Sequence, residues 1–245
     1  MLRTFLADLH VHTCLSPCGE DEMTPTAIVR QARKMGLDVI AVCDHNSTRN
    51  VDPVRRAGRG EGLAVIGGVE VSSEEEVHVL GLFRDDEGLR EMQRVIDENL
   101  LAENTPSLFG QQWLCDERDT IVGRESRLLI GATGLTIEEV VERIHRLGGL
   151  AVPSHVDRER FSILSQLGFV PEGLPVDALE VSPLRSLAEA TRAFDSIRGF
   201  PLIRSSDAHR LAEIGTVSTV FTAAEPSVEE LAKALLGEDG RELMN

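Results

Sequence analysis

Short apolar runs alternate along this chain with segments in which apolar residues recur every three to four positions. Val39–Cys43 is a continuous apolar run, typical of a strand buried on both faces of a sheet. Ile28, Val29, Ala32 and Met35 instead form one stripe of an amphipathic helix. Alternating strands and helices predict a parallel sheet with right-handed crossovers, and thus an α/β fold.

The same pattern predicts elements along the whole chain. Strand-like runs occupy residues 3–9, 39–43, 63–66, 76–83, 150–153, 178–181, 201–203 and 217–221. Helical segments occupy residues 25–36, 48–59, 89–101, 136–147, 161–167, 184–197 and 227–236. The alternation breaks over 102–133, where a small hairpin insertion is expected, covering the barrel mouth. We expect one domain over residues 1–245, since this length suits a single large α/β domain.

Six of the seven histidines lie at or just past the ends of strand-like runs. His10 and His12 are two residues apart, so both point to one face of a strand. That pair alone would fit two hydrogen-bonded histidines on a polar strand face, but the other positions repeat the pattern. His145 is the exception, within the predicted helix 136–147, where a solvated or core histidine is expected.

The ends of parallel strands meet at one end of a barrel, which is where such folds gather their active sites. We therefore expect eight strand-end residues to converge: His10, His12, His45, Glu70, His78, His155, Asp207 and His209. Six imidazoles and two carboxylates exceed the needs of one ion, so two or three divalent ions are expected. This donor set favours Zn, Mn or Fe.

Charge and composition narrow the expected partners. The formal net charge is −16, and the chain lacks the broad basic surface that nucleic-acid binding needs. We therefore expect a small phosphorylated substrate or nucleotide and no long nucleic acid. Residues 1–6 are too short and too charged for a signal peptide, and no apolar run reaches membrane-spanning length. These features predict a cytoplasmic protein without a membrane partner; they do not determine its oligomeric state.

The order of these motifs resembles the PHP family, which comprises the polymerase and histidinol phosphatase domains. The motifs are Asp8-Leu9-His10-Val11-His12-Thr13, Asp44-His45-Asn46, the strand-end Glu70, the strand residue His78, Pro153-Ser154-His155 and Ser206-Asp207-Ala208-His209. The resemblance implies a distorted seven-stranded (β/α) barrel of the TIM type with a metal cluster at the strand ends. It also implies phosphoesterase activity.

The resemblance further implies how the ligands divide among the ions. The first ion would take His10, His12, Glu70 and Asp207, and Glu70 would bridge to a second ion held with His78 and His155. His45 and His209 would hold a third ion.

One position departs from the family pattern. Many members carry an Asp or His five residues beyond the second histidine of His-x-His, and here that position is Pro17. Cys18, Glu20 or Asp21 are the candidate replacements, and we rank the carboxylates above Cys18 because hard oxygen ligands suit Mn, Fe or Zn exchanging a phosphate. Otherwise water or the substrate completes the third site.

The expected chemistry is hydrolysis of a phosphate ester of a small metabolite or nucleotide. Paired cations lower the pKa of a water molecule and provide a hydroxide near neutral pH. Glu70 and Asp207 would organise these ions, while Arg158, Arg160 and Arg210 would neutralise the phosphoryl oxygens. The alternatives are an exonuclease acting on an end of DNA or RNA, a metal-binding regulatory domain without turnover, and C–N hydrolysis.

Overall fold

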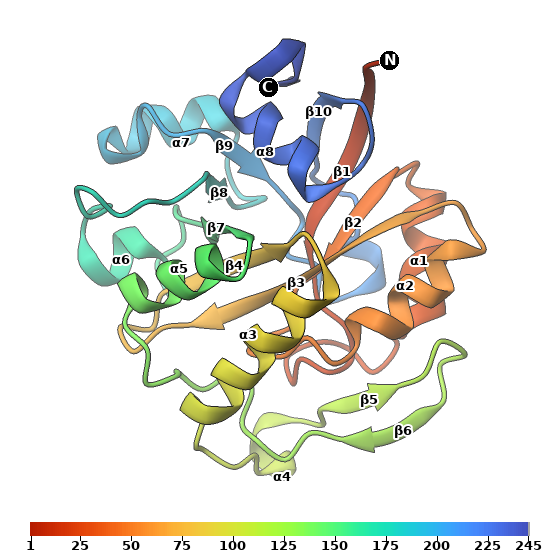
Figure 1. Ribbon diagram of the computed structural model, residues 1–245. Coiled ribbons are helices and arrows are strands. Elements are labelled where there is room, and N and C mark those ends of the chain that lie inside the picture. The colour runs from red at the N-terminus through yellow and green to blue at the C-terminus, as the bar shows by residue number, and fades with distance from the viewer. Residues whose placement is uncertain (245) are drawn as a thin grey trace.

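A curled seven-stranded sheet forms the centre of the protein, in a computed structural model that describes residues 1–244 (Figure 1). Its strands lie in the order β11-β10-β1-β2-β3-β4-β7. They are β1 (Arg3–Val11), β2 (Val39–Val42), β3 (Ala64–Ser72), β4 (His78–Phe83), β7 (Gly149–Pro153), β10 (Thr219–Ala223) and β11 (Glu242–Leu243). Two small sheets accompany it, β5 (Trp113–Cys115) with β6 (Ile121–Arg124) and β8 (Leu179–Val181) with β9 (Leu202–Arg204).

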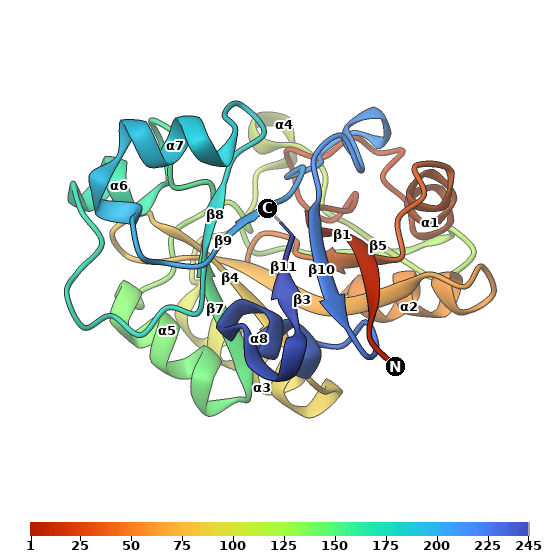
Figure 2. The same ribbon diagram turned by 90° about the horizontal axis from the view of Figure 1, so that it is seen from above.

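Helices surround the sheet, with α6 and α7 lying together beyond β8 and β9 (Figure 2). They are α1 (Pro25–Lys34), α2 (Val51–Arg59), α3 (Asp86–Asn99), α4 (Pro106–Phe109), α5 (Ile137–Arg146), α6 (Ile163–Leu167), α7 (Leu187–Ala193) and α8 (Val228–Leu236). Short 3₁₀ turns occupy Asp195–Ile197, Leu211–Glu213 and Glu238–Gly240. Among residues 1–244, no helix combines the length and apolarity needed to cross a bilayer.

Local sequence signals explain where several helices begin. Thr136 and Glu139 form the reciprocal capping box expected at the start of α5. Ser227 caps α8 by accepting a hydrogen bond from the Glu230 backbone N–H. The helix predicted over 184–197 is shorter, because α7 ends at Ala193 and Phe194 adopts an extended backbone before the next 3₁₀ turn.

The mixed α/β barrel-like fold is confirmed, but the prediction of a wholly parallel sheet is wrong. β1, β2 and β3 are parallel, whereas β4 is antiparallel to both β3 and β7, and β10 is antiparallel to β1. β3 and β4 form a hairpin in which Ser72 pairs with His78. A hairpin needs no crossover helix, which is why no helix separates these two strands.

The insertion over 102–133 does contain a hairpin, formed by β5 and β6, which projects from the sheet (Figure 1). It is attached to the loop after β1, because the Trp113 backbone N–H donates to Cys14 O at 3.0 Å. Within this insertion only Ile130 lines the large pocket described below. The hairpin therefore lies beside the barrel mouth, and the expectation that it covers the mouth is wrong.

Candidate metal centre

All eight strand-end residues meet at one edge of the curled sheet, around the carboxylate of Glu70. His45 Nδ1 lies 2.9 Å and His78 Nδ1 3.1 Å from the Glu70 oxygens. His155, His10 and His12 follow at 3.3, 3.5 and 3.5 Å. Asp207 Oδ1 lies 3.1 Å from His12 Nε2 and 3.3 Å from His10 Nε2, and 3.6 Å from His209 Nδ1. The structure thus brings the predicted residues into one cluster, whose role as metal ligands stays a prediction.

Three groups within the cluster have donor atoms close enough to share an ion. They are His10, His12, Glu70 and Asp207; His45, Glu70 and His78; and His12, His45 and His209. The first group matches the one that the family resemblance implies. In the second, His45 takes the place expected for His155, and in the third, His12 joins His45 and His209.

Buried polar atoms without a well-formed hydrogen bond support a metal at this cluster. His45 Nδ1 and His78 Nδ1 lie 2.9 and 3.1 Å from the Glu70 oxygens, but these buried atoms form no hydrogen bond of good geometry. Buried polar atoms in proteins are almost always hydrogen-bonded, so lone pairs that face one another without a hydrogen bond need an explanation. Divalent ions between the carboxylate and the imidazoles would satisfy these atoms.

Metal binding requires ionised carboxylates and neutral imidazoles, and the electrostatics of the cluster favour the first throughout and the second at some positions. Burial alone would raise the pKa of Glu70, but the positive charges of His78, His10 and His45 hold that pKa well below its usual range. Burial likewise opposes ionisation of Asp207, yet the charge of His10 and a hydrogen bond with His12 lower its pKa. Burial and the nearby His209 and His45 lower the pKa of His12, which favours its neutral form. Burial also opposes protonation of His10 and His45, but neighbouring negative charges raise the pKa of both rings, so protons compete with an ion at these two positions.

Strand geometry positions half of the cluster. His10 lies in β1, His12 follows the last residue of that strand, and their Nε2 atoms are 3.0 Å apart; Glu70 lies near the end of β3. His78 differs from expectation, because it begins β4 rather than ending a parallel strand. The antiparallel β3–β4 hairpin returns His78 to the same edge of the sheet as the end of β3.

Loops that follow strands position the other half. His155 and Asp207 both have left-handed backbone, with φ of 31° and 50°. Asp8, buried in β1, accepts hydrogen bonds from the Ser206 backbone N–H at 2.9 Å and the Ser206 hydroxyl at 2.6 Å. Burial nevertheless raises the pKa of Asp8 to about 6. The two hydrogen bonds to Asp8 fix Ser206, which directly precedes Asp207.

A further carboxylate, Glu180 in β8, contacts the cluster and was not predicted from the sequence. Its Oε2 lies 3.0 Å from His10 Nδ1 and accepts a hydrogen bond from the His155 backbone N–H at 3.1 Å. It is 1% exposed. The sequence did give one signal, because Glu180 lies inside the apolar run 178–181. Burying an unpaired charge is costly, so a buried partner for this carboxylate could have been expected.

Asp44, which precedes His45 in the chain, acts on His12 through Ser16. It accepts hydrogen bonds from the Thr13 backbone N–H at 2.7 Å and from the Ser16 hydroxyl at 2.7 Å. Ser16 Oγ lies 2.9 Å from His12 Nδ1. This chain of contacts orients the His12 ring so that Nε2 faces the cluster.

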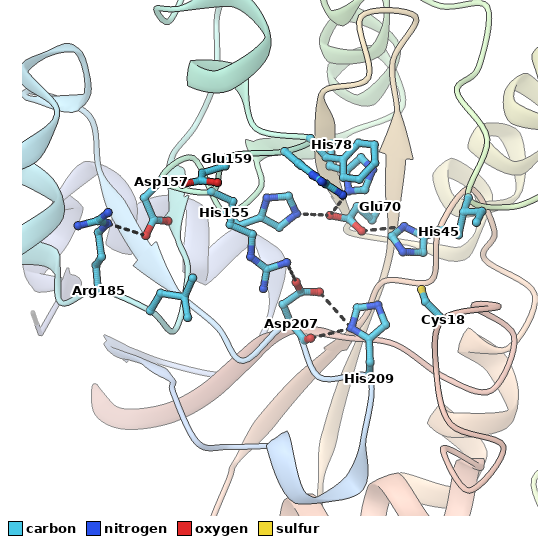
Figure 3. A pocket seen from close by; sticks show the side chains of 15 residues that line it. Cys18, His45, Glu70, His78, His155, Asp157, Glu159, Arg185, Asp207 and His209 are labelled. Atoms are coloured by element: carbon cyan, nitrogen blue, oxygen red, sulfur yellow. Dashed lines mark hydrogen bonds and ion pairs between the residues drawn. The ribbon is translucent and has the colours of Figure 1, made fainter. Parts of the chain in front are cut away.

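The loop after β1 places Cys18, rather than a carboxylate, beside the cluster. The Cys18 sulfur faces the imidazoles of His45 and His209 (Figure 3). Glu20 instead pairs with Arg210 at 3.3 Å, and Asp21 accepts a hydrogen bond from Trp113 Nε1 at 3.0 Å. The geometry favours Cys18 over the carboxylates, against the expected ranking, because both carboxylates have partners away from the cluster; which of them binds an ion stays a prediction.

All of the cluster residues except His10 and His12 line a pocket of about 890 Å³ (Figure 3). Arg158 lies in this pocket and pairs with Asp207 at 2.6 Å, and Arg160 also lines it. Arg185, which was not among the sequence candidates, lines it too, 3.7 Å from Asp157. Arg210 lies in a smaller neighbouring pocket and pairs with Glu20.

His145 lies apart from the cluster, as predicted. It belongs to α5, and its Nε2 is 2.8 Å from Asp177 Oδ2.

Several known proteins are similar to this chain in sequence. A 5'-3' exoribonuclease from Escherichia coli (strain K12) is 30% identical over 198 residues, which cover 63% of this chain and 67% of that protein. A phosphoribosyl 1,2-cyclic phosphate 1,2-diphosphodiesterase from Eggerthella lenta is 35% identical over 136 residues, covering 51% of this chain and 50% of that protein.

The lesion-specific endonuclease Q from Pyrococcus furiosus has a similar fold, with a TM-score of 0.72 at 20% identity. The similarity covers 99% of this chain but only 58% of that enzyme. A second structure shows endonuclease Q in complex with a 27-mer duplex carrying an abasic lesion at the active site, and it matches 99% of this chain with a TM-score of 0.67.

These relatives overturn the expectation that long nucleic acid is excluded. The exclusion rested on the net charge of −16. An exoribonuclease and a duplex-bound endonuclease among the similar proteins show that this family fold serves nucleic-acid enzymes. Total charge was a poor guide, because a nucleic-acid end or lesion contacts only the local charges around the site.

The model of the PHP domain matches residues 8–152, and that of a PHP-associated region matches residues 190–238. The first match alone covers more than half of the chain and contains His10, His12, His45, Glu70 and His78. The chain therefore belongs to the PHP family of metal-dependent phosphoesterases.

Proposed function

We propose that this protein hydrolyses a phosphoester of a nucleotide, either free or at the end of a nucleic-acid strand, with two or three divalent ions. One observation carries the proposal: a cluster of six imidazoles and two carboxylates, buried except for the partly exposed His209, adjoins a pocket that three arginines also line. The relatives support the nucleotide part, since the curated names include an exoribonuclease and a cyclic-phosphate diesterase.

The ligand roles follow the geometry. His10, His12, Glu70 and Asp207 would hold one ion, and Glu70 with His78 and His155 a second. His45 and His209 would hold a third, because His12 Nδ1 contacts Ser16 and leaves only Nε2, which serves the first ion. Zinc, manganese and iron all suit these donors. Ions held here would supply Lewis-acid stabilisation of the phosphoryl group and an acidified water.

The residues around the cluster prepare the site for such a substrate. Asp44, through Ser16, and Glu180 fix the ring orientations of His12 and His10. Arg158 forms an ion pair with Asp207, which places its guanidinium group beside the cluster. Guanidinium groups at the pocket wall would bind the non-reacting phosphate oxygens and hold the phosphorus beside Glu70.

A substrate screen tests the proposal. Metal-loaded protein would be assayed for phosphate release from nucleotides and sugar phosphates, and for degradation of end-labelled single-stranded and duplex oligonucleotides. We expect turnover of at least one nucleotide or oligonucleotide substrate and its loss with chelator. Stable metal binding without turnover of any phosphoester would overturn the proposal and support the regulatory alternative.

A further inference from the structure

Phe161 has an unusual backbone for a bulky residue. Its φ is 58°, in the left-handed region that favours glycine. Among residues 1–244, the other positive-φ positions are glycine, asparagine, aspartate or histidine, with Glu76 as the one further exception. Strained backbone of this kind clusters at functional sites. The residue is also 40% exposed, although phenylalanine is usually buried.

The hydrogen bonds around Phe161 do not require its side chain. Its carbonyl oxygen accepts from the His78 backbone N–H at 3.0 Å. The following residue, Ser162, donates through its hydroxyl to Arg158 O at 2.7 Å. A glycine at position 161 would make the same backbone contacts without strain. These backbone contacts therefore do not explain why position 161 is a phenylalanine.

The ring lies between the cluster and the open pocket. One face packs on the imidazole of His78, with ring centroids 4.8 Å apart and planes inclined by 14°. Because His78 covers that face, the exposed area belongs to the other face and the edge, and Phe161 lines the pocket. His78 Nδ1 is in turn 3.1 Å from Glu70.

Positive charge is available in the pocket that the ring lines. Arg158, Arg160 and Arg185 line it together with carboxylates, and Arg158 and Arg185 pair with Asp207 and Asp157. Among residues 1–244, Arg160 has no ion-pair partner, so its charge is available to a ligand. An aromatic face beside guanidinium groups suits a planar base attached to a phosphate, since stacking accepts any base and the arginines take the anion.

We propose that the open face of Phe161 stacks on a nucleobase of the substrate while the attached phosphate reaches the cluster beside His78. This inference rests on the proposed function and sharpens it. The substrate must carry a base next to the reacting phosphate, and a base-free sugar phosphate would bind more weakly.

The test uses two ligands that cannot be hydrolysed and differ only in the base. They are the 5'-methylenephosphonate analogues of 2-aminopurine riboside and of ribose. Manganese-loaded protein is titrated with the first while 2-aminopurine fluorescence is followed, and the second is measured by competition. Phe161→Leu removes the stacking face but keeps apolar cover on His78, and Phe161→Trp keeps stacking. Phe169→Leu is the matched control, because Phe169 is 56% exposed and lies outside the pocket lining.

We expect quenched fluorescence and about tenfold tighter binding of the base-bearing analogue, which corresponds to about 1.4 kcal/mol of stacking. Phe161→Leu should bring this affinity ratio close to one, while Phe161→Trp and Phe169→Leu should preserve it. Unchanged ratios in Phe161→Leu, or a ratio of one in the wild type, would overturn the inference. If Phe161 only supported His78, both ligands would weaken equally and the ratio would persist. Because binding is read without turnover, a normal ratio in a protein that hydrolyses nothing would reject the proposed function and leave the stacking site standing.

Discussion

The cluster has two halves that the protein builds by different means. The strand-borne half consists of His10, Glu70 and His78, which lie on β1, β3 and β4, and of His12, which directly follows β1. The loop-borne half consists of His45, His155, Asp207 and His209, which follow β2, β7 and β9. Ladder hydrogen bonds and the alternation of side chains fix the strand-borne half directly.

The loop-borne half depends on buried carboxylates instead. Asp8 fixes Ser206, Glu180 accepts from the His155 backbone N–H, and two of the four loop-borne residues have left-handed backbone. Such conformations persist only when the surroundings over-determine them. The difference teaches that a loop can position a ligand as firmly as a strand can, provided that a buried acceptor restrains its backbone.

The largest effects should come from the carboxylate of each half. Glu70→Gln and Asp207→Asn keep size but weaken a ligand, so each should reduce metal-dependent phosphoester hydrolysis by more than about 100-fold, beyond the range for outer-shell partners. The measurement is steady-state turnover beside thermal melting. Glu159→Gln, an exposed carboxylate of the same pocket, is the control and should retain activity. Undiminished turnover in either cluster variant would remove that residue from the metal centre.

Removing the charge of Glu180 should loosen the link between the halves, since Glu180 contacts both His10 and His155. Glu180→Gln keeps the shape but weakens the acceptor, and we expect metal affinity to fall by about 10- to 100-fold. Metal titration by calorimetry checks this. An affinity equal to that of the wild type would mean that Glu180 supports the fold and not the metals.

The loop after β1 carries the side chains that could complete the site of the third ion. Cys18 faces His45 and His209, while Glu20 and Asp21 have partners elsewhere. Cys18→Ser should therefore lower the bound metal by up to one ion per chain, and Glu20→Ala and Asp21→Ala should not. Metal content per chain, with sulfur-to-cobalt absorption in cobalt-substituted protein, gives the readout. Normal metal content and no such absorption would assign the third site to water or substrate.

The smallest effect concerns strain away from the cluster. Glu76 is exposed and has φ of 60° in the turn between β3 and β4. Glu76→Gly should relieve this strain and raise the free energy of unfolding by about 0.5–1 kcal/mol without changing turnover. Urea unfolding measures it. A loss of stability would show that the Glu76 side chain contributes contacts that outweigh its backbone strain.

The strand-borne half was largely predictable from the sequence, because side chains two apart on a strand must share a face. His10 and His12 follow from that rule alone. The antiparallel direction of β4 was not predictable, since an apolar run does not reveal strand direction. The direction is seen in the pairing of β3 with β4, for example of Ser72 with His78.

The remaining features of the site depend on residues far apart in the chain, which limits what the sequence can predict. Glu180 is 170 residues from His10 in the chain, and nothing in its local sequence indicates that contact. The role of Cys18 was likewise hidden, because Glu20 and Asp21 look like better ligands until their partners Arg210 and Trp113 are known. Phe161 gave no sequence signal either, because the sequence alone does not reveal a left-handed backbone.

The central claim is that the buried cluster holds the divalent ions that phosphoester hydrolysis requires. The most direct measurement strips the protein with chelator and then adds Mn²⁺ stepwise, following bound metal and hydrolysis of a nucleotide or end-labelled oligonucleotide in the same samples. The account predicts no turnover in stripped protein and recovery that saturates at two or three ions per chain. Undiminished turnover in the stripped protein, or saturation at two or three ions without hydrolysis of any phosphoester, would contradict it.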